Sequence, residues 1–354
     1  MKIFTFIILM LIINITLFAN FEAAAYPSAG YSNETGLYGG VITYLRFTPQ
    51  DSISSNHKNM FYLTTSYTEK KQFILKLKPE LYFNQSLNRL EIELLYKKWP
   101  SNFYGIGMNT DLHNFERYSS IAKSLITTFS RKINDFWEIS LYSEYVNYAI
   151  TENDVDGMLS SATTLGGNGS ITTGMGLIFS YDDRNVTAFP TQGSLLIFQV
   201  NSFSEVLKSD FEFSEYILDL RKYFPLNNAN TLALQSYLST IRGEAPFNQM
   251  NYLNDYMRAV TSNLYINKSA FILRAEDRVF IWNDGFKKRL GFALFIEMGE
   301  VASRIDNLNL NNLQLNYGFG FRYSFFLEDR MNVRLDIGFA EGQSNISISA
   351  GEVF

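Results

Sequence analysis

The segment from Leu313 to Phe325 alternates strictly between two kinds of side chain. Every odd position is apolar or aromatic, and every even position is polar, charged or glycine. Successive side chains of a β-strand point to opposite faces, so a period of two predicts one strand with two unlike faces. Similar alternation recurs at Phe73–Phe83, Ile171–Arg184 and Met331–Phe339. The pattern therefore predicts an all-β chain.

The length of these segments separates two all-β architectures. They run for about 10 to 14 residues, whereas strands of globular proteins usually have about 5 to 6. About 9 to 11 tilted residues cross a bilayer. Aromatic residues make up 16% of the chain and crowd the strand ends, as an interfacial girdle requires. A soluble β-sandwich is the alternative, but strand length and aromatic content favour a transmembrane antiparallel β-barrel.

We place about sixteen strands, an even number that suits a closed single-chain barrel. The first is Leu37–Phe47, and the others are centred near residues 60, 76, 92, 105, 124, 143, 176, 198, 217, 236, 276, 296, 319, 336 and 350. The expected short periplasmic turns are Thr68–Lys71, Arg131–Asp135 and Glu328–Met331. The expected long external loops are Thr151–Ser170, Gly243–Ser269 and Val301–Asn312.

The N-terminus is typical of an export signal. Lys2 precedes an apolar run that ends in small residues at Ala19 and Ala23–Ala25, which predicts a cleaved signal peptide. A membrane anchor is the alternative, but Asn14 and Asn20 interrupt the run before the roughly 20 apolar residues of a spanning helix. We therefore expect delivery to the bacterial outer membrane. The predicted divisions are a signal peptide at 1–25, a short periplasmic segment at 26–34 and the barrel at 35–354.

Composition excludes several classes of function. The chain has no cysteine, and its 30 basic and 35 acidic residues are scattered, so neither thiol chemistry nor nucleic-acid binding is expected. The two histidines, His57 and His113, fall in external loops without an evident catalytic partner. Asp154–Gly157 resembles part of a calcium loop, but Glu152 and Thr163 stand where such a loop needs other residues. We expect no enzyme activity, catalytic residue, metal or cofactor.

Four motifs resemble the bacterial surface antigen barrel family, which includes BamA, TamA and the two-partner secretion transporters. The first is Tyr181–Asn185 followed by Phe189–Gly193, with Gln192 where the family usually has Arg. It contains Asp182, Arg184, Pro190 and Gly193. The other three follow in the family's order: Met257–Val260 in the sixth external loop, Glu276–Arg278 in the next strand and Phe295–Gly299 one strand later. The resemblance covers residues 35–354 and implies a barrel of this type.

The resemblance implies a contact between the sixth loop and the barrel wall. Alternation turns Ile296 and Met298 to lipid, so Glu297 points into the lumen beside Gly299. By resemblance Arg258 pairs with Glu297 and holds the loop inside, in the space that Gly299 leaves. The alternative is that Arg258 is solvated and Glu297 is one of many lumen charges. Met257, Ala259 and Glu297 itself depart from the family pattern. The resemblance also selects Glu276 and Arg278 as motif residues.

Two further positions carry expectations. The alternation around Asp277 places it on the lipid face, where a charge is costly away from the interface, so we expect it close to the periplasmic rim. Ile346–Phe354 resembles the C-terminal signal that the barrel-assembly machinery reads, with Gly351 and Phe354 as its marked residues.

Three functions fit these observations. The family resemblance implies insertion or translocation of polypeptides. Relatives do this with periplasmic POTRA domains, for which about ten residues before Leu37 leave no room, so a separate periplasmic partner would be needed. A passive solute pore is the second function, lined by lumen charges at Lys76, Lys78, Glu91, Glu93, Arg322, Arg334 and Asp336. The third is a structural or adhesive surface protein that acts through its external loops.

Overall fold

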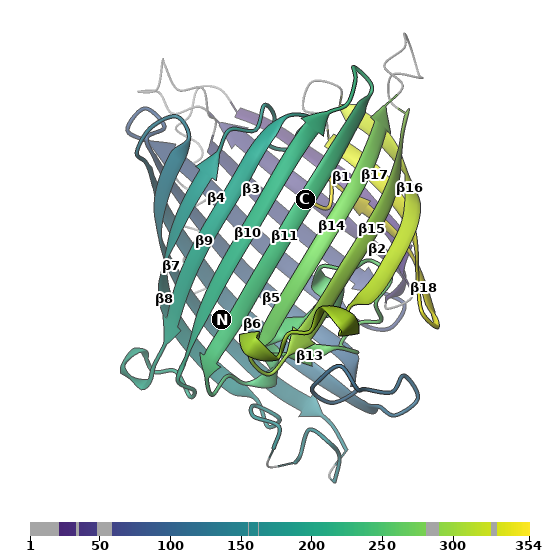
Figure 1. The fold of residues 1–354 in the computed structure, drawn as a ribbon. Coiled ribbons are helices and arrows are strands. Elements are labelled where there is room, and N and C mark those ends of the chain that lie inside the picture. Colours follow the sequence, from purple (N-terminus) through teal and green to yellow (C-terminus); the bar gives the residue numbers. More distant parts are fainter. Residues whose placement is uncertain are drawn as a thin grey trace.

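The computed structural model is a single curved sheet of sixteen antiparallel strands that forms a barrel (Figure 1). The structure describes residues 21–32, 35–47, 59–154, 156–161, 163–280, 290–326 and 331–354. Each strand pairs with the next strand of the sheet along the chain. β11 pairs with β14, and the connection between them contains β12 and β13. An all-β antiparallel barrel of about sixteen strands, as the alternation predicted, is confirmed.

The first half of the barrel comprises β1 (Phe21–Ser32), β2 (Gly36–Phe47), β3 (Asn59–Thr68), β4 (Phe73–Phe83), β5 (Asn88–Phe103), β6 (Glu116–Lys132), β7 (Trp137–Glu152) and β8 (Ser170–Asp182). The second half comprises β9 (Gly193–Phe203), β10 (Phe213–Pro225), β11 (Asn230–Gly243), β14 (Ser269–Phe280), β15 (Leu290–Ala302), β16 (Gln314–Phe326), β17 (Met331–Ala340) and β18 (Gln343–Ala350). A small hairpin pairs β12 (Asn251–Tyr252) with β13 (Ile266–Asn267).

Short 3-10 helices lie in the connections. They are η1 (Glu205–Leu207), η2 (Phe247–Gln249), η3 (Leu253–Asp255), η5 (Ile305–Asn307) and η6 (Leu310–Asn312). No helix in the described part of the chain is long and apolar enough to cross a membrane.

Burial follows the alternation of the sequence. In β11 and β14 buried and half-buried residues alternate along nearly the whole strand, because every second side chain points into the lumen. Large apolar side chains of the other set stay exposed on the outer face, including Leu125, Leu141, Met175, Leu177, Phe198, Leu220, Leu294, Ile296, Leu315, Tyr317 and Phe321. An apolar outer face and a charged lumen are the arrangement of a membrane-spanning barrel.

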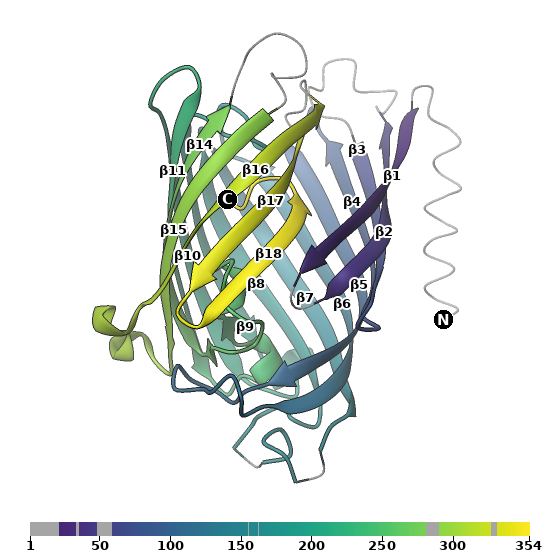
Figure 2. The same cartoon turned by 90° about the vertical axis from the view of Figure 1, so that its right-hand side faces the viewer.

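The two ends of the barrel differ. The longest described connections, 104–115, 153–169, 244–268 and 303–313, all lie at the lower end in Figure 1, which we call the loop end. The opposite end, which we call the terminus end, has short turns at 84–87, 133–136 and 226–229. Because the number of strands is even, β1 starts at the terminus end and β18 runs toward the same end, stopping short of its rim (Figure 2).

The structure corrects two strand predictions. Phe21–Ser32 forms β1 and pairs with Gly36–Phe47 along its whole length, so the predicted first strand at Leu37 is the second, and most of the predicted segment 26–34 is strand. The predicted strand near residue 105 is a loop. Gly105 and Gly107 adopt φ values of +97° and +131°, and Gly107 bridges to Ile266 in the connection after β11, so the backbone there leaves the sheet.

These two errors compensate in number but shift the direction of the early strands. Thr68–Lys71 was predicted as a periplasmic turn together with Arg131–Asp135, but the turn after β3 lies at the loop end and the turn after β6 at the terminus end. Because one strand before β2 was missed, every turn up to residue 105 was assigned to the wrong end of the barrel. The predicted turn Glu328–Met331 lies almost wholly outside the described residues, as do His57 and the first 20 residues of the predicted signal peptide.

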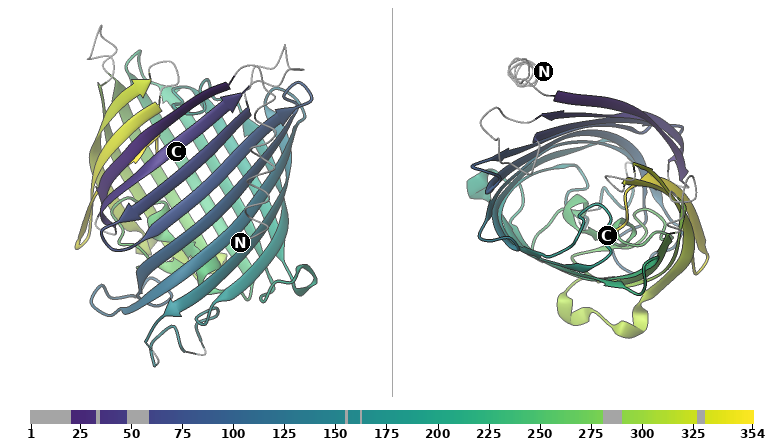
Figure 3. Two further views of the ribbon diagram at one scale, coloured as in Figure 1. Left: turned by 180° about the vertical axis from the view of Figure 1, so that it is seen from behind. Right: turned by 90° about the horizontal axis from the view of Figure 1, so that it is seen from above.

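The barrel has a seam between its first and last strands. β1 and β18 lie side by side (Figures 2 and 3), but in the described residues no backbone ladder joins them, unlike every other neighbouring pair of the sheet. One side chain spans the seam. Tyr38 of β2 lies over Gly30 of β1, where a Cβ would meet its hydroxyl at 2.5 Å, and donates a 2.8 Å hydrogen bond to the Ile348 carbonyl of β18.

Candidate functional site

The connection between β11 and β14, residues 244–268, folds into the lumen, and we call it loop six. Its inward side is apolar: Phe247, Leu253 and Ile266 have no exposed surface. Phe247 packs edge to face against Phe103, at 5.3 Å between ring centroids, and it also contacts Tyr118 and Tyr148. Side chains of β5, β6 and β7 therefore hold one side of the loop by hydrophobic packing.

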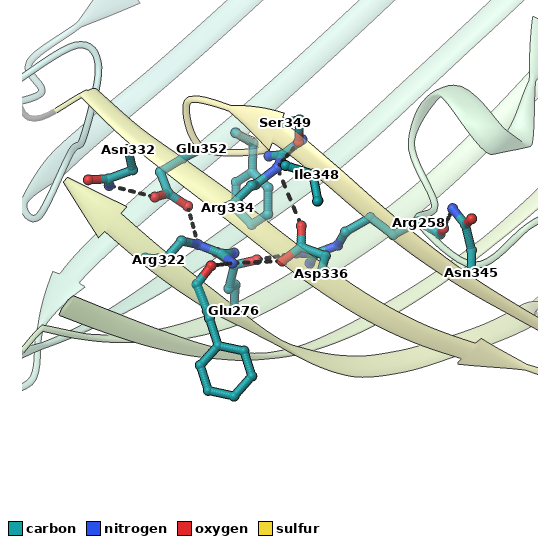
Figure 4. Close-up of polar contacts among 12 residues, drawn as sticks. Arg258, Glu276, Arg322, Asn332, Arg334, Asp336, Asn345, Ile348, Ser349 and Glu352 are labelled. Atoms are coloured by element: carbon teal, nitrogen blue, oxygen red, sulfur yellow. Dashed lines mark hydrogen bonds and ion pairs between the residues drawn. The ribbon is translucent and has the colours of Figure 1, made fainter. Parts of the chain in front are cut away.

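On the opposite side of the lumen, Arg258 of loop six meets the carboxylates of Glu297, Glu276 and Asp336. Figure 4 shows Arg258 with Glu276 and Asp336. Its Nε donates to Glu297 at 2.7 Å, and its backbone N–H donates to the same carboxylate at 2.7 Å. Its Nη1 donates to Glu276 at 2.6 Å and lies 3.5 Å from Asp336. The guanidinium also stacks on Phe295, 3.3 Å from the ring centroid. The contact that the resemblance implied between Arg258 and Glu297 is therefore present.

The environment of Arg258 keeps it charged. Burial lowers the pKa of the guanidinium, but attraction to Glu297, Glu276 and Asp336 outweighs burial and raises the pKa above its ordinary value. Glu297 is completely buried. Removing one partner would leave an uncompensated buried charge, which costs more than the pair itself contributes.

Gly299 provides room for the loop. A Cβ at this position would lie 2.8 Å from the Met257 sulfur and 2.9 Å from a methyl group of Leu253. Both side chains belong to loop six, so the loop approaches β15 as closely as the missing side chain permits.

The Arg258 contacts belong to a larger buried network. Arg322 of β16 donates to Asp336 at 2.7 Å and to Glu352 at 3.1 Å, and it lies 3.4 Å from Glu276. Arg278 of β14 donates to Glu276 at 2.8 Å. Arginines and carboxylates therefore alternate from loop six to β17, and this pairing of opposite charges makes a dense set of buried charges tolerable.

The end of the chain lies in the lumen and not in the wall. β18 ends at Ala350, and Gly351 turns with φ of +79°. Phe354 is 4% exposed, its backbone oxygen accepts a 2.8 Å hydrogen bond from Arg278, and Arg274 lies 4.8 Å from its ring centroid. The glycine turn directs residues 351–354 away from the wall and toward these arginines. A role of Gly351 and Phe354 in assembly stays a prediction.

The first family motif forms the β8–β9 turn at the terminus end. Arg184 donates to Asp182 at 2.9 and 2.7 Å, and Gly193 has φ of +107° with a neighbouring carbonyl where its Cβ would stand. Pro190 is buried, and Phe189 packs on Phe280 at 4.6 Å. The motif thus fixes a tight turn that directs one aromatic side chain inward.

The remaining candidate residues are dispersed. Asp277 lies close to the end of β14 at the terminus end and pairs with Leu294 of the outward-facing set. Lys76 and Lys78 form salt bridges with Glu93 and Glu91 at 2.6 and 3.1 Å. These four charges lie on β4 and β5, apart from the network.

Glu116 holds the loop that contains Asp154–Gly157, which resembled part of a calcium loop. The Glu116 carboxylate of β6 accepts the backbone N–H of Leu159 at 2.8 Å and that of Asp154 at 3.3 Å. The His113 backbone N–H bonds to Asp111 at 2.9 Å.

The sequence named most members of the network but not their association. Glu276, Arg278, Arg322 and Asp336 each appeared as motif or lumen residues, whereas Glu352 did not appear. The register places Glu276 opposite Phe295 and Arg322 opposite Arg334. Alternation alone does not fix a register, so it could not show which lumen charges meet.

Sixteen antiparallel strands, an apolar outer face and a lumen filled by a charged network and an inserted loop define an outer-membrane β-barrel. Within this class the family is also shown. A model of the Omp85 superfamily domain matches residues 50–258, more than half of the 354 residues, and the chain belongs to this superfamily. The predicted resemblance to BamA-like barrels is confirmed.

Two solved structures resemble the whole barrel. BamA from Haemophilus ducreyi lacking POTRA domains 1–3 matches with a TM-score of 0.63 and 12% identity, over 93% of this chain and 70% of that one. CdiB from Acinetobacter baumannii matches with a TM-score of 0.59 and 9% identity, over 94% of this chain and 59% of that one. At these identities the likeness shows the fold. No curated protein matches the sequence.

Proposed function

We propose that this barrel assists the insertion or translocation of polypeptides at the outer membrane, together with a separate periplasmic partner. The observation that carries the proposal is the seam between β1 and β18. Edge strands present unpaired N–H and C=O groups, which are templates for pairing with another chain. Peptide segments bind such edges by adding a strand. A client strand would pair with β1 or β18 after the two separate.

Other features agree with this function. Loop six and residues 351–354 occupy the lumen beside β14–β18, so they support the wall from within while the seam opens. The structures of BamA and CdiB show the same fold in this superfamily. Export through a cleaved signal peptide and contact with outer-membrane lipid are part of the proposal.

Site-specific photocrosslinking tests the seam. A photoreactive amino acid replaces Ala29, an exposed residue of β1. The matched control carries it at Leu220, which is also exposed but lies on β10, a strand paired on both sides. Adducts with newly made barrel proteins from Ala29, but not from Leu220, are the expected result. Equal labelling from both positions would contradict a role of the seam.

The pore and surface-protein functions remain the alternatives. A pore predicts large steady conductance of the purified barrel, and a surface protein predicts that its activity depends on loop-end residues only. Neither alternative requires the seam between β1 and β18.

A further inference from the structure

A groove of about 400 Å³ crosses the outer face of the barrel at β10, β11, β14 and β15, which lie side by side in Figure 1. The small side chains of Ser236 and Ala275 leave the surface hollow there, between the larger side chains of Leu220, Ile296 and Met298. Alternation turns all five side chains away from the lumen. The groove therefore opens to the lipid and not to the charged network.

The groove runs obliquely across the wall. Lys222 of β10 pairs with Leu234 of β11. Leu234 also pairs with Ala275 of β14, which pairs with Ile296 of β15. Because the strands lean, this row of side chains descends from the terminus end at β10 toward the loop end at β15 (Figure 1). Three strand spacings make the row about 14 Å long, close to half of the ~30 Å hydrocarbon core of a bilayer. One extended acyl chain fits this shape.

Two side chains of opposite charge flank the groove on the terminus-end side. Lys222 lines it, close to the end of β10, and its Nζ donates to the Ser194 hydroxyl at 2.8 Å. Asp277 is half-buried and follows Ala275 on the same face of β14. Two strand spacings and two residues separate Lys222 from Asp277, which places their Cα atoms about 12 Å apart. Within the described residues neither of the two forms a salt bridge.

These charges fit the headgroup level of the membrane. A charge on the lipid face of a barrel is tolerated near the interface and costly at the midplane. A lysine extends along apolar surface to place its ammonium group among the headgroups, where lipid phosphates are its partners. Asp277 needs a cation in the same region. A phospholipid with an ethanolamine headgroup supplies both, since its phosphate is anionic and its terminal amine is cationic.

We propose that the groove binds one phospholipid with an ethanolamine headgroup, from the leaflet at the terminus end. The phosphate accepts a hydrogen bond from Nζ of Lys222, the ammonium group lies toward Asp277, and one acyl chain lies over Ser236 and Ala275. An anionic headgroup without an amine pairs with Lys222 alone, and Asp277 repels it. The site is separate from the seam between β1 and β18 and does not depend on the proposed function.

Native mass spectrometry of the folded barrel tests the site. The barrel is released from detergent micelles that contain phosphatidylethanolamine or phosphatidylglycerol, and the retained lipid is counted. The wild type is expected to retain one phosphatidylethanolamine in preference to phosphatidylglycerol. Ala275→Leu is expected to lose it, because the larger side chain fills the hollow. Ala149→Leu is the matched control, since Ala149 is an exposed alanine of β7 outside the groove, and its retained lipid is expected to stay unchanged.

Two charge variants test the headgroup contacts. Lys222→Gln is expected to weaken binding of both lipids about fivefold, the effect of one exposed ion pair, whereas Lys123→Gln, at an exposed lysine of β6, leaves it unchanged. Asp277→Asn is expected to abolish the preference for phosphatidylethanolamine.

The outcomes are distinct. If Ala275→Leu does not fold, the comparison of Lys222→Gln with Lys123→Gln decides. The proposal is overturned if the wild type retains no lipid or retains both lipids equally. It is also overturned if Ala275→Leu retains as much lipid as Ala149→Leu, which would leave the groove to another occupant, such as an apolar segment of a partner protein.

Discussion

Arg258 connects a loop to three different strands with one side chain. Glu276, Glu297 and Asp336 belong to β14, β15 and β17, and each lies within 3.5 Å of its guanidinium. A planar group with five donors can satisfy several carboxylates at once, which a lysine cannot. Substituting Arg258 therefore tests how strongly loop six is held in the lumen.

Arg258→Met is expected to destabilise the barrel by about 3–5 kcal/mol, because it leaves buried carboxylates without their partner. Urea unfolding in detergent measures the effect. Arg304→Met is the control, since this arginine is 74% exposed in a surface pair with Asp306, and such pairs contribute about 0–1 kcal/mol. Similar losses in both variants would show that Arg258 has no special role.

The charge exchange Arg258→Glu/Glu297→Arg is expected to recover only part of the stability lost in either single variant. The new carboxylate would face Glu276 and Asp336, which the exchange leaves unchanged. Full recovery in the same unfolding measurement would contradict the three-carboxylate geometry.

Gly299→Ala is expected to destabilise the barrel by about 1–3 kcal/mol, because the added methyl group overlaps Met257 and Leu253. Gly39→Ala is the control, since a Cβ at Gly39 meets nothing within 4 Å. Limited proteolysis should then cut loop six faster in Gly299→Ala. Equal cutting rates would contradict the close approach of the loop to β15.

At the scale of elements, alternation predicted the kind and approximate number of strands. It did not predict β1, because Phe21–Ser32 contains an alanine run that also fits the end of a signal peptide. It placed a strand near residue 105, where the glycine conformations direct the chain to loop six. Individual strands are thus readable from local pattern, whereas the direction of each depends on counting every strand before it.

The pairing of β1 makes a prediction about processing. Phe21–Ala25 pairs with Thr43–Phe47, so cleavage after Ala25 would remove five residues of the β1 ladder. We expect the mature protein to begin at or before Phe21, where Ala19 offers a small residue for cleavage. N-terminal sequencing of protein purified from membranes decides, and a mature start at Tyr26 would contradict a full-length β1.

Tyr38→Phe is expected to loosen the seam, because it removes the hydrogen bond from β2 to the Ile348 carbonyl of β18. A net loss of about 0.5–1.5 kcal/mol should raise crosslinking from Ala29 by a few fold. Tyr145→Phe, an exposed tyrosine on the outer face of β7, is the control. Unchanged crosslinking in Tyr38→Phe would show that the hydrogen bond does not hold the seam.

At the scale of the whole molecule, the lumen is partly occupied by the chain's own loop and C-terminal residues. Loop six, the network and residues 351–354 narrow the lumen beside β14–β18, and a cavity of about 910 Å³ remains next to them. The wild-type barrel is therefore expected to show no large steady openings in a planar bilayer. A variant with residues 247–265 replaced by a short linker should conduct, since it removes the loop from the lumen. Large openings in the wild type would favour the pore function.

The inserted loop also constrains the order of assembly. Loop six is bound on one side by β5–β7 and on the other by β14, β15 and β17, so its final contacts need residues more than 200 positions apart. Loop six starts and ends at the loop end, after β11 and before β14. We therefore expect the loop to take its place while the sheet is still an open arc, so that closure between β1 and β18 comes last in assembly.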